Sequence, residues 1–208
     1  MRRSGKNLRM SYPGLNFSLC FYDKKRVIME EVDIEKALTY IEPGPLVLVT
    51  TFDGRRNNVM TISWTMAIDF AQHIVLTTGP WNHSFNTLLE KRECVVCIPP
   101  VSMLETVVCI GMVSGAEVDK FEKFGLKALP ARTVEAPLID GCAACLECRV
   151  TDYIDRYGFI ILKVTRVVEN PDCTDRRIIH AIGDGTFTAD GESFNCRELM
   201  SEKLPPGL

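Results

Sequence analysis

Residues 58–64 read NVMTISW, and residues 77–84 read TTGPWNHS. In the first segment small hydroxyl side chains recur at alternate positions, Thr61, Ser63 and Thr65, which places them on one face of an expected strand. The second segment ends in polar residues that begin an expected helix, whose first backbone amides are free to bind an anion. Together the two segments predict a site for a ligand that carries both a phosphate and a ring.

The chain around these segments has the pattern of an antiparallel barrel. Apolar, β-branched runs predict strands over residues 46–52, 60–68, 74–78, 94–98, 146–154, 159–168 and 178–182. Helical spacing and end signals predict helices over residues 33–41, 84–92, 102–109 and 119–124, and residues 130–140 are expected to form a loop. Strands that follow one another closely, with helices inserted between them, predict a mainly β closed barrel with peripheral helices.

Two of the helix starts are predicted from individual residues. Asp33 is expected to cap the first helix, and Ser102 with Glu105 matches a capping box. Residues 1–30 have no clean period and are expected to form an N-terminal extension with a possible strand over 17–21, whereas residues 31–208 are expected to form a single domain.

Composition excludes several classes of protein. The chain has 208 residues, 46% of them hydrophobic, and a net charge of -3, which gives no basic footprint for nucleic acid. No window approaches the roughly 20 apolar residues of a membrane span, and residues 1–10 lack the apolar centre of a signal peptide. We therefore expect a cytoplasmic protein without membrane or nucleic-acid partners. Its nine cysteines are expected to be free thiols.

Residues 58–64 and 77–87 resemble the FMN-binding split barrel family of flavin reductase-like proteins, and its flavoredoxin-type members most closely. The resemblance runs from about Pro43 to Glu192 and implies an antiparallel Greek-key split barrel. It also implies an FMN-dependent oxidoreductase that transfers hydride or electrons, either as an NAD(P)H-dependent flavin reductase or as an electron carrier. A homodimer and a small-molecule or protein redox partner are implied as well. The chemistry would be carried by FMN, so no catalytic side chain is assigned.

The same resemblance places individual residues around the cofactor. The strand segment would run beside the isoalloxazine and ribityl chain, the neighbouring strand end would contribute backbone and hydroxyls, and the helix start would approach the phosphate or ring edge. Lys120 would bring a positive charge to the ring, and Phe187 would cover it. The complete set is Asn58, Val59, Met60, Thr61, Ser63, Trp64, Thr77, Thr78, Gly79, Asn82, His83, Ser84, Thr87, Lys120 and Phe187.

Several of these assignments have a plain structural alternative. Trp64 is more often a core residue, His83 could bond only to the backbone at the helix start, and Lys120 could be a surface lysine. Residues 183–187, GDGTF, could form a simple hairpin turn, and we reject a dinucleotide loop there because no strand–loop–helix unit surrounds it. Arg55 and Arg56 are expected in a solvated turn, with assistance to a phosphate as the alternative.

A second motif supports a different class of function. Cys142, Cys145 and Cys148 form two consecutive CxxC spacings, which are typical of thiolate metal sites. A fourth ligand is missing nearby, because Asp152 stands where a further cysteine would be needed, although residues 173, 180 or 196 could supply one through the fold. The alternative function is therefore a non-catalytic metal- or thiol-based module. Unliganded thiols, a redox-active pair and a metal site all remain open from the sequence.

Overall fold

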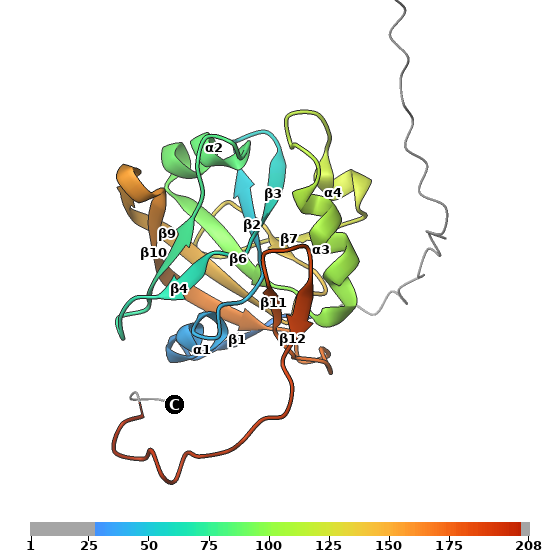
Figure 1. Cartoon of the computed structure of the whole chain (residues 1–208). Helices are drawn as coiled ribbons and strands as arrows, with labels where there is room; N and C mark the ends of the chain where they lie inside the picture. The colour runs from blue at the N-terminus through green and yellow to red at the C-terminus, as the bar shows by residue number, and fades with distance from the viewer. Residues whose placement is uncertain (1–27, 205–208) are drawn as a thin grey trace, which may run out of the picture.

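The buried, β-branched runs of the sequence form one curled antiparallel sheet (Figure 1). The computed structural model describes residues 28–204. Seven strands follow the order β3-β2-β6-β9-β10-β5-β4, and an eighth, β1, pairs with β10. Their bounds are β1 Glu30–Val32, β2 Val47–Phe52, β3 Asn57–Ile62, β4 Thr65–Ala67, β5 His73–Thr77, β6 Glu93–Ile98, β9 Ala144–Ile154 and β10 Phe159–Glu169. The sequence prediction of a mainly β barrel with peripheral helices is confirmed.

A sharp corner of the chain connects the two edge strands of the sheet. β3 and β4 end the strand order on opposite sides, yet only Ser63 and Trp64 separate them in the sequence. The expected single strand over residues 60–68 is therefore wrong, because the chain must cross here from one sheet edge to the other. At this corner the backbone amide of Thr77 donates a hydrogen bond to the carbonyl oxygen of Trp64, with an N–O distance of 3.0 Å.

Two hydrophobic cores lie on the two faces of the curled sheet. Val96 and Leu146 belong to the inner core, whereas their neighbours Val95 and Cys145 belong to an outer core beneath the inserted helices and hairpins. Side chains of a strand alternate between faces, so a strand covered on both faces is apolar at every position. This arrangement explains the continuous apolar runs in β6 and at the start of β9.

Short helices cover the ends and one side of the barrel. Their bounds are η1 Ile34–Lys36, α1 Ala37–Ile41, α2 Ser84–Lys91, η2 Val101–Met103, α3 Leu104–Gly111, α4 Lys120–Lys123 and η3 Asp155–Tyr157. The expected cap at Asp33 is confirmed, since its carboxylate accepts the amide of Glu35 at 3.0 Å. The capping box at Ser102 is wrong, because this residue lies inside η2, which begins after Pro100, and α3 starts only at Leu104.

The remaining strands form two small ladders outside the main sheet. β7 (Ala128–Leu129) pairs with β8 (Leu138–Ile139), so the expected loop over 130–140 is wrong for its last residues, which pack in the outer core. β11 (Ile179–Ala181) pairs with β12 (Phe187–Ala189) as a hairpin. Gly183 and Gly185 have φ of +99° and +93°, which glycine adopts readily, so the hairpin-turn alternative for this segment is confirmed.

Part of the predicted chain lies outside the described residues. The N-terminal extension falls there except for residues 28–30, and with it the strand expected over 17–21. Between residues 28 and 204, no helix has the length and apolar character needed to cross a membrane.

Candidate functional site

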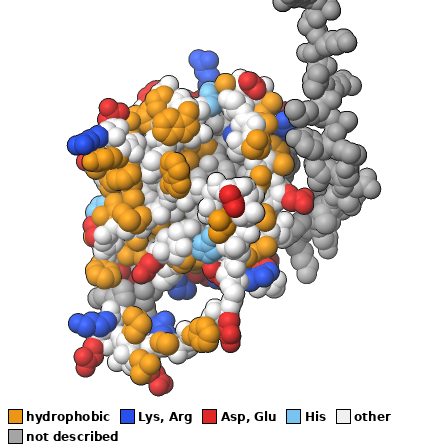
Figure 2. Space-filling view, viewed as in Figure 1, with side chains coloured by type: hydrophobic (Ala, Val, Ile, Leu, Met, Phe, Trp, Pro, Cys, Tyr) orange, Lys and Arg blue, Asp and Glu red, His pale blue; other side chains and the backbone are white. Residues whose placement is uncertain are grey.

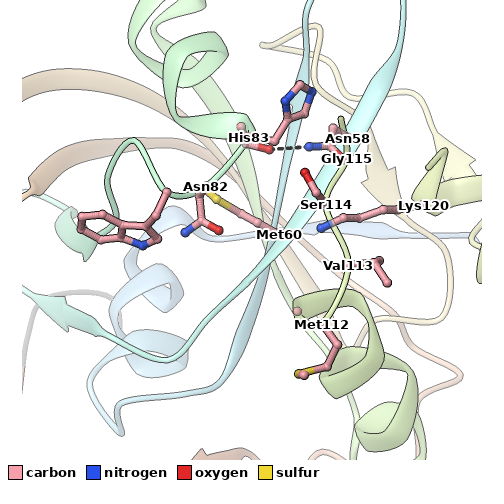
Figure 3. A pocket seen from close by; sticks show the side chains of 12 residues that line it. Asn58, Met60, Asn82, His83, Met112, Val113, Ser114, Gly115 and Lys120 are labelled. Carbon is pink, nitrogen blue, oxygen red and sulfur yellow. Dashed lines mark hydrogen bonds between the residues drawn. The ribbon is translucent and has the colours of Figure 1, made fainter. Parts of the chain in front are cut away.

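A cavity of about 220 Å³ opens between β3, the start of α2 and the segment that joins α3 to α4 (Figure 3). β3 contributes alternate residues, the turn before α2 contributes a polar cluster, and the end of α3 continues into a loop that forms the opposite wall. The lining residues are Asn58, Met60, Trp81, Asn82, His83, Ser84, Gly111, Met112, Val113, Ser114, Gly115 and Lys120.

The start of α2 is tied to the sheet through one hydroxyl. Ser84 Oγ accepts the side-chain amide of Asn58 at 2.8 Å and the hydroxyl of Thr51 at 3.2 Å. A serine hydroxyl has two acceptor positions and one donor. Because protein groups fill both acceptor positions, the hydroxyl hydrogen is the group left for a ligand, and it would donate to an anionic oxygen.

Lys120 is a buried cation beside the cavity. The residue is 5% exposed, and its Nζ donates to the carbonyl oxygen of Ile110 at 3.0 Å. It takes part in none of the ion pairs found between residues 28 and 204. Burial lowers its pKa from the ordinary 10.5 to about 8, because the charged amine loses water. The surface-lysine alternative is therefore wrong.

Two glycines leave space for side chains that line the cavity. An added Cβ on Gly115 would lie 2.4 Å from Oδ1 of Asn58, so only glycine lets the loop after α3 approach β3 this closely. An added Cβ on Gly79 would lie 2.3 Å from the indole of Trp81. Arg56 donates to the carbonyl oxygen of Gly115, so its guanidinium holds this loop and does not line the cavity.

The structure brings six of the fifteen sequence-predicted residues to the cavity: Asn58, Met60, Asn82, His83, Ser84 and Lys120. The side chain of His83 makes no capping bond to the backbone of α2. Their role in binding a cofactor stays a prediction.

The other predicted residues lie away from the cavity lining. Val59 is buried in the outer core, Thr61 donates to the carbonyl oxygen of Val107 at 2.6 Å, and Thr78 accepts the side-chain amide of Asn82 at 2.9 Å. Phe187, in β12, packs against the outer core. Trp64 is 67% exposed, so the core alternative for this residue is wrong. Residues outside the lining are Val59, Thr61, Ser63, Trp64, Thr77, Thr78, Gly79, Thr87 and Phe187.

Sequence reasoning missed the wall formed by residues 111–115, and it left Trp81 out of the predicted site. The only local signal was the pair of glycines around a short apolar segment, GMVSG. Nothing in that pattern indicates that the loop returns to β3, because the contact depends on how α3 packs against this strand.

The three cysteines of the CxxC motifs do not converge. Cys142 and Cys145 lie in the outer core, whereas Cys148 points into the inner core on the other face of β9. No group of three or more histidine, cysteine or acidic side chains within residues 28–204 is arranged to hold a metal ion. A metal module built on these three residues is therefore wrong, since Cys145 and Cys148 lie three positions apart on β9 and face opposite sides of the strand.

Comparisons with known proteins agree with the fold. The profile of the Flavin reductase like domain matches residues 40–183. An uncharacterized protein of Archaeoglobus fulgidus is 26% identical over 168 residues, covering 76% of this chain and 94% of the relative. The uncharacterized protein YddH of Escherichia coli is 26% identical over 181 residues, covering 77% and 94%.

Solved structures show the same architecture. The FMN-binding domain of a flavin reductases-like enzyme from Shewanella baltica OS155 is 25% identical with a TM-score of 0.75, covering 81% of this chain and 97% of that chain. Flavoredoxin of Desulfovibrio vulgaris (Miyazaki F) is 21% identical with a TM-score of 0.68, covering 73% and 89%. The curled sheet is thus an FMN-binding split barrel. With a family profile that spans more than half of its residues, the chain belongs to the flavin reductase-like family.

Proposed function

We propose that this protein binds FMN at the cavity between β3, α2 and α4 and acts as an FMN-dependent oxidoreductase. The observation that carries the proposal is Lys120, a buried amine beside a cavity and outside every ion pair of the described chain. Burying an unpaired charge is costly, so a ligand that brings negative charge to Lys120 would relieve that cost. Bound FMN supplies hydride or electron transfer, which no side chain of the protein provides.

The donors around the cavity fit the two polar ends of this cofactor. Ser84 has a hydroxyl hydrogen to offer, and the first backbone amides of the eight-residue helix α2 favour an anion, so the phosphate end belongs here. Lys120 would then stand at the polar edge of the ring and favour the anionic reduced state. In this arrangement Asn58 keeps Ser84 oriented, while Met60 and Val113 supply apolar contact.

The size of the cavity limits how much of the cofactor it can enclose. Sites for drug-sized ligands usually measure about 300–1,000 Å³, whereas this cavity measures about 220 Å³. The rest of the ligand would lie across the open rim, where Trp81 is 72% and Met112 is 78% exposed. Those side chains offer flat and adaptable apolar surface to a ring.

A visible spectrum of the purified protein, followed by titration with FMN, tests the proposal. We expect flavin absorption bands, or stoichiometric uptake of FMN when the protein is purified without it. A colourless protein that takes up no FMN would show that the proposal is wrong.

The proposal includes a homodimer in which the second copy covers the cavity rim. Trp64, Met66, Ile68 and Phe70 are all exposed along β4 and the turn that follows it, and β4 is an edge strand. Hydrophobic side chains gather on the side of the molecule that carries β4 (Figure 2). An apolar strip on an open sheet edge is the kind of surface that binds another chain.

The mass in solution, measured by light scattering, tests the dimer. We expect a dimer for the parent and a monomer for Met66→Glu, which places a charge in the middle of the strip. Lys123→Glu, on the exposed side of α4, serves as the control and should stay dimeric. A monomeric parent that still binds FMN tightly would contradict the dimer without contradicting the flavin site.

The electron donor separates the two forms of the proposed activity. A flavin reductase would accept hydride from NADH or NADPH, whereas an electron carrier would exchange single electrons with a protein partner in the cytoplasm. Anaerobic mixing of the FMN-loaded protein with NADH and with NADPH distinguishes them. Rapid bleaching of the visible absorption band of the flavin supports the reductase, and an unchanged spectrum supports the carrier.

A further inference from the structure

β6 and β9 bring buried thiols together in two pairs. Cys97 lies directly opposite Cys145 in the ladder, and Cys94 lies opposite Cys148. The first pair faces the outer core and the second faces the inner core, so the same two strands carry one pair on each side. Neither pair contributes to the cavity at β3, and neither has a role in the proposed function.

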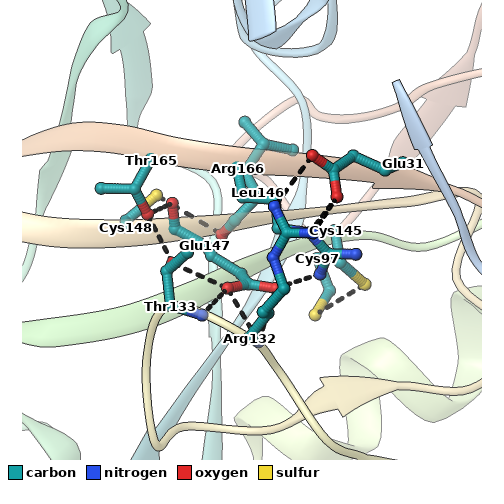
Figure 4. A network of polar contacts seen from close by, with 10 residues as sticks. All are labelled: Glu31, Cys97, Arg132, Thr133, Cys145, Leu146, Glu147, Cys148, Thr165 and Arg166. Atoms are coloured by element: carbon teal, nitrogen blue, oxygen red, sulfur yellow. Dashed lines mark hydrogen bonds and ion pairs between the residues drawn. The ribbon is translucent and has the colours of Figure 1, made fainter. Parts of the chain in front are cut away.

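The outer pair has the geometry to form a bond. The Sγ of Cys145 donates to the Sγ of Cys97 at 3.4 Å, as Figure 4 shows. Directly opposed residues of an antiparallel ladder have Cα atoms about 4.5–5.5 Å apart, which falls within the 4.4–6.8 Å seen for disulfides. The two sulfurs, 3.4 Å apart, therefore need to move together by about 1.4 Å to reach the disulfide length of roughly 2.05 Å.

A third thiol and a surface turn adjoin this pair. Cys142 lies in the same outer core as Cys97 and Cys145, and it follows the half-exposed turn formed by Asp140 and Gly141. The Oδ1 atom of Asp140 is buried and has no hydrogen-bond partner. A buried oxygen of this kind normally binds a water molecule. A place for a small uncharged polar molecule therefore lies two residues before Cys142 in the chain.

We propose that Cys97 and Cys145 form an oxidisable dithiol that hydrogen peroxide converts into a disulfide across β6 and β9. One thiol loses its proton and its sulfur attacks a peroxide oxygen, so that the O–O bond breaks and a sulfenic acid and one water form. The second sulfur then attacks the sulfenic sulfur, the S–O bond breaks, and the hydroxyl leaves with the second thiol proton as another water. The two sulfurs lose two electrons, and the two peroxide oxygens accept them.

Burial sets the rate of this reaction. Desolvation raises the pKa of the Cys97 thiol, so the reactive thiolate is scarce. Cys109 and Cys196 are exposed and should react with peroxide before the pair does. The site therefore responds only to sustained exposure to the oxidant.

Peptide mapping of the full chain tests the proposal. A Cys109→Ser background leaves Cys94 and Cys97 as the only thiols in the tryptic peptide 93–120, whereas Cys142, Cys145 and Cys148 share the peptide 133–149. After peroxide treatment, denaturation and alkylation, mass spectrometry without reduction should find these two peptides linked, and dithiothreitol should release them. The link should be lost completely in Cys97→Ser and in Cys145→Ser.

Matched variants keep the test decisive. Cys94→Ser and Cys148→Ser alter the opposite face of the same two strands and should retain the link, as should Cys142→Ser. Circular dichroism before oxidation shows that each variant is folded. Loss of the link in Cys94→Ser or Cys148→Ser, a bridge confined to Cys142 and Cys145, or no bridge in the folded parent would each overturn the proposal.

Discussion

Replacing Lys120 by Met is expected to stabilise the FMN-free protein and to weaken its binding of FMN. The amine is nearly buried, and its pKa falls from 10.5 to about 8 on folding. At about 1.36 kcal/mol per unit, holding the charge at pH 7 costs the fold about 3 kcal/mol. Loss of the hydrogen bond to the carbonyl oxygen of Ile110 offsets about 1 kcal/mol of the gain. The net expectation is a gain of about 2 kcal/mol in the free energy of unfolding.

The pH dependence follows from the same shift. Between pH of about 8 and 10.5 the unfolded chain binds more protons at Lys120 than the folded chain does, so the stability of the parent rises with pH in this window. Below about pH 8 both states carry the proton, so the stability no longer changes with pH through this group and the full cost of burying the charge remains. The Met variant has no such group, so its advantage should be largest at pH 7 and should shrink towards pH 10.

Urea unfolding of the FMN-free proteins at pH 7 and pH 10 measures these differences, and fluorescence quenching measures FMN affinity. We expect a loss of about 1.5–3 kcal/mol of FMN binding, roughly 10- to 150-fold, for one charge-assisted contact. Lys123→Met, on the same short helix but exposed, is the control and should change neither quantity. A Met variant less stable than the parent at pH 7, or an equal gain in the control, would refute the reasoning about the buried charge.

Three further predictions concern the cavity walls and the sheet. Ser84→Ala should weaken FMN by about 1–3 kcal/mol and riboflavin much less, because only FMN carries the phosphate, whereas Thr87→Ala, outside the cavity lining, should affect neither ligand when both are titrated. Gly115→Ala should cost about 1–3 kcal/mol of stability, since its Cβ would meet the Asn58 amide, and Gly191→Ala, with open space around it, should be neutral in urea unfolding. Glu147→Gln should destabilise the protein by about 3–5 kcal/mol, because Arg166 and the amides of residues 132 and 133 lose their buried carboxylate. The hydrogen bonds and ion pair that lower the pKa of Glu147 also predict that the parent loses stability as the pH falls below about 4.5, and that the Gln variant shows less of this acid dependence in unfolding experiments.

The sequence predicted best those elements whose environment is uniform along their length. β2 and β6 are covered on both faces, so their apolar runs define them with small errors at the ends. The break at Ser63 and Trp64 was missed because both halves have strand character, and only the closure of the sheet makes the chain turn there. The capping box at Ser102 failed for a related reason, since Pro100 starts a tighter turn first.

The candidate site was predictable only on the side built from contiguous residues. Asn58, Met60 and the 82–84 cluster come from two short segments with recognisable chemistry, and all of them line the cavity. The loop over 111–115 lies far from β3 in the sequence and carries no chemical signature. Its position depends on packing between α3 and β3, which local periodicity does not encode.

The location of the cavity follows from the split in the barrel. β3 ends the strand order, so one side of this strand has no neighbouring strand, and α3 and α4 pack against β3 instead. A helix covers an edge less completely than a strand does, because its side chains and not its backbone make the contact. α2 approaches the same region from β5 and is fastened to β2 and β3 through Thr51, Asn58 and the shared hydroxyl of Ser84. The edge strand, the start of α2 and the loop after α3 therefore meet around a space that polar groups line and no strand fills, which is where a barrel with a packed interior can still hold a ligand.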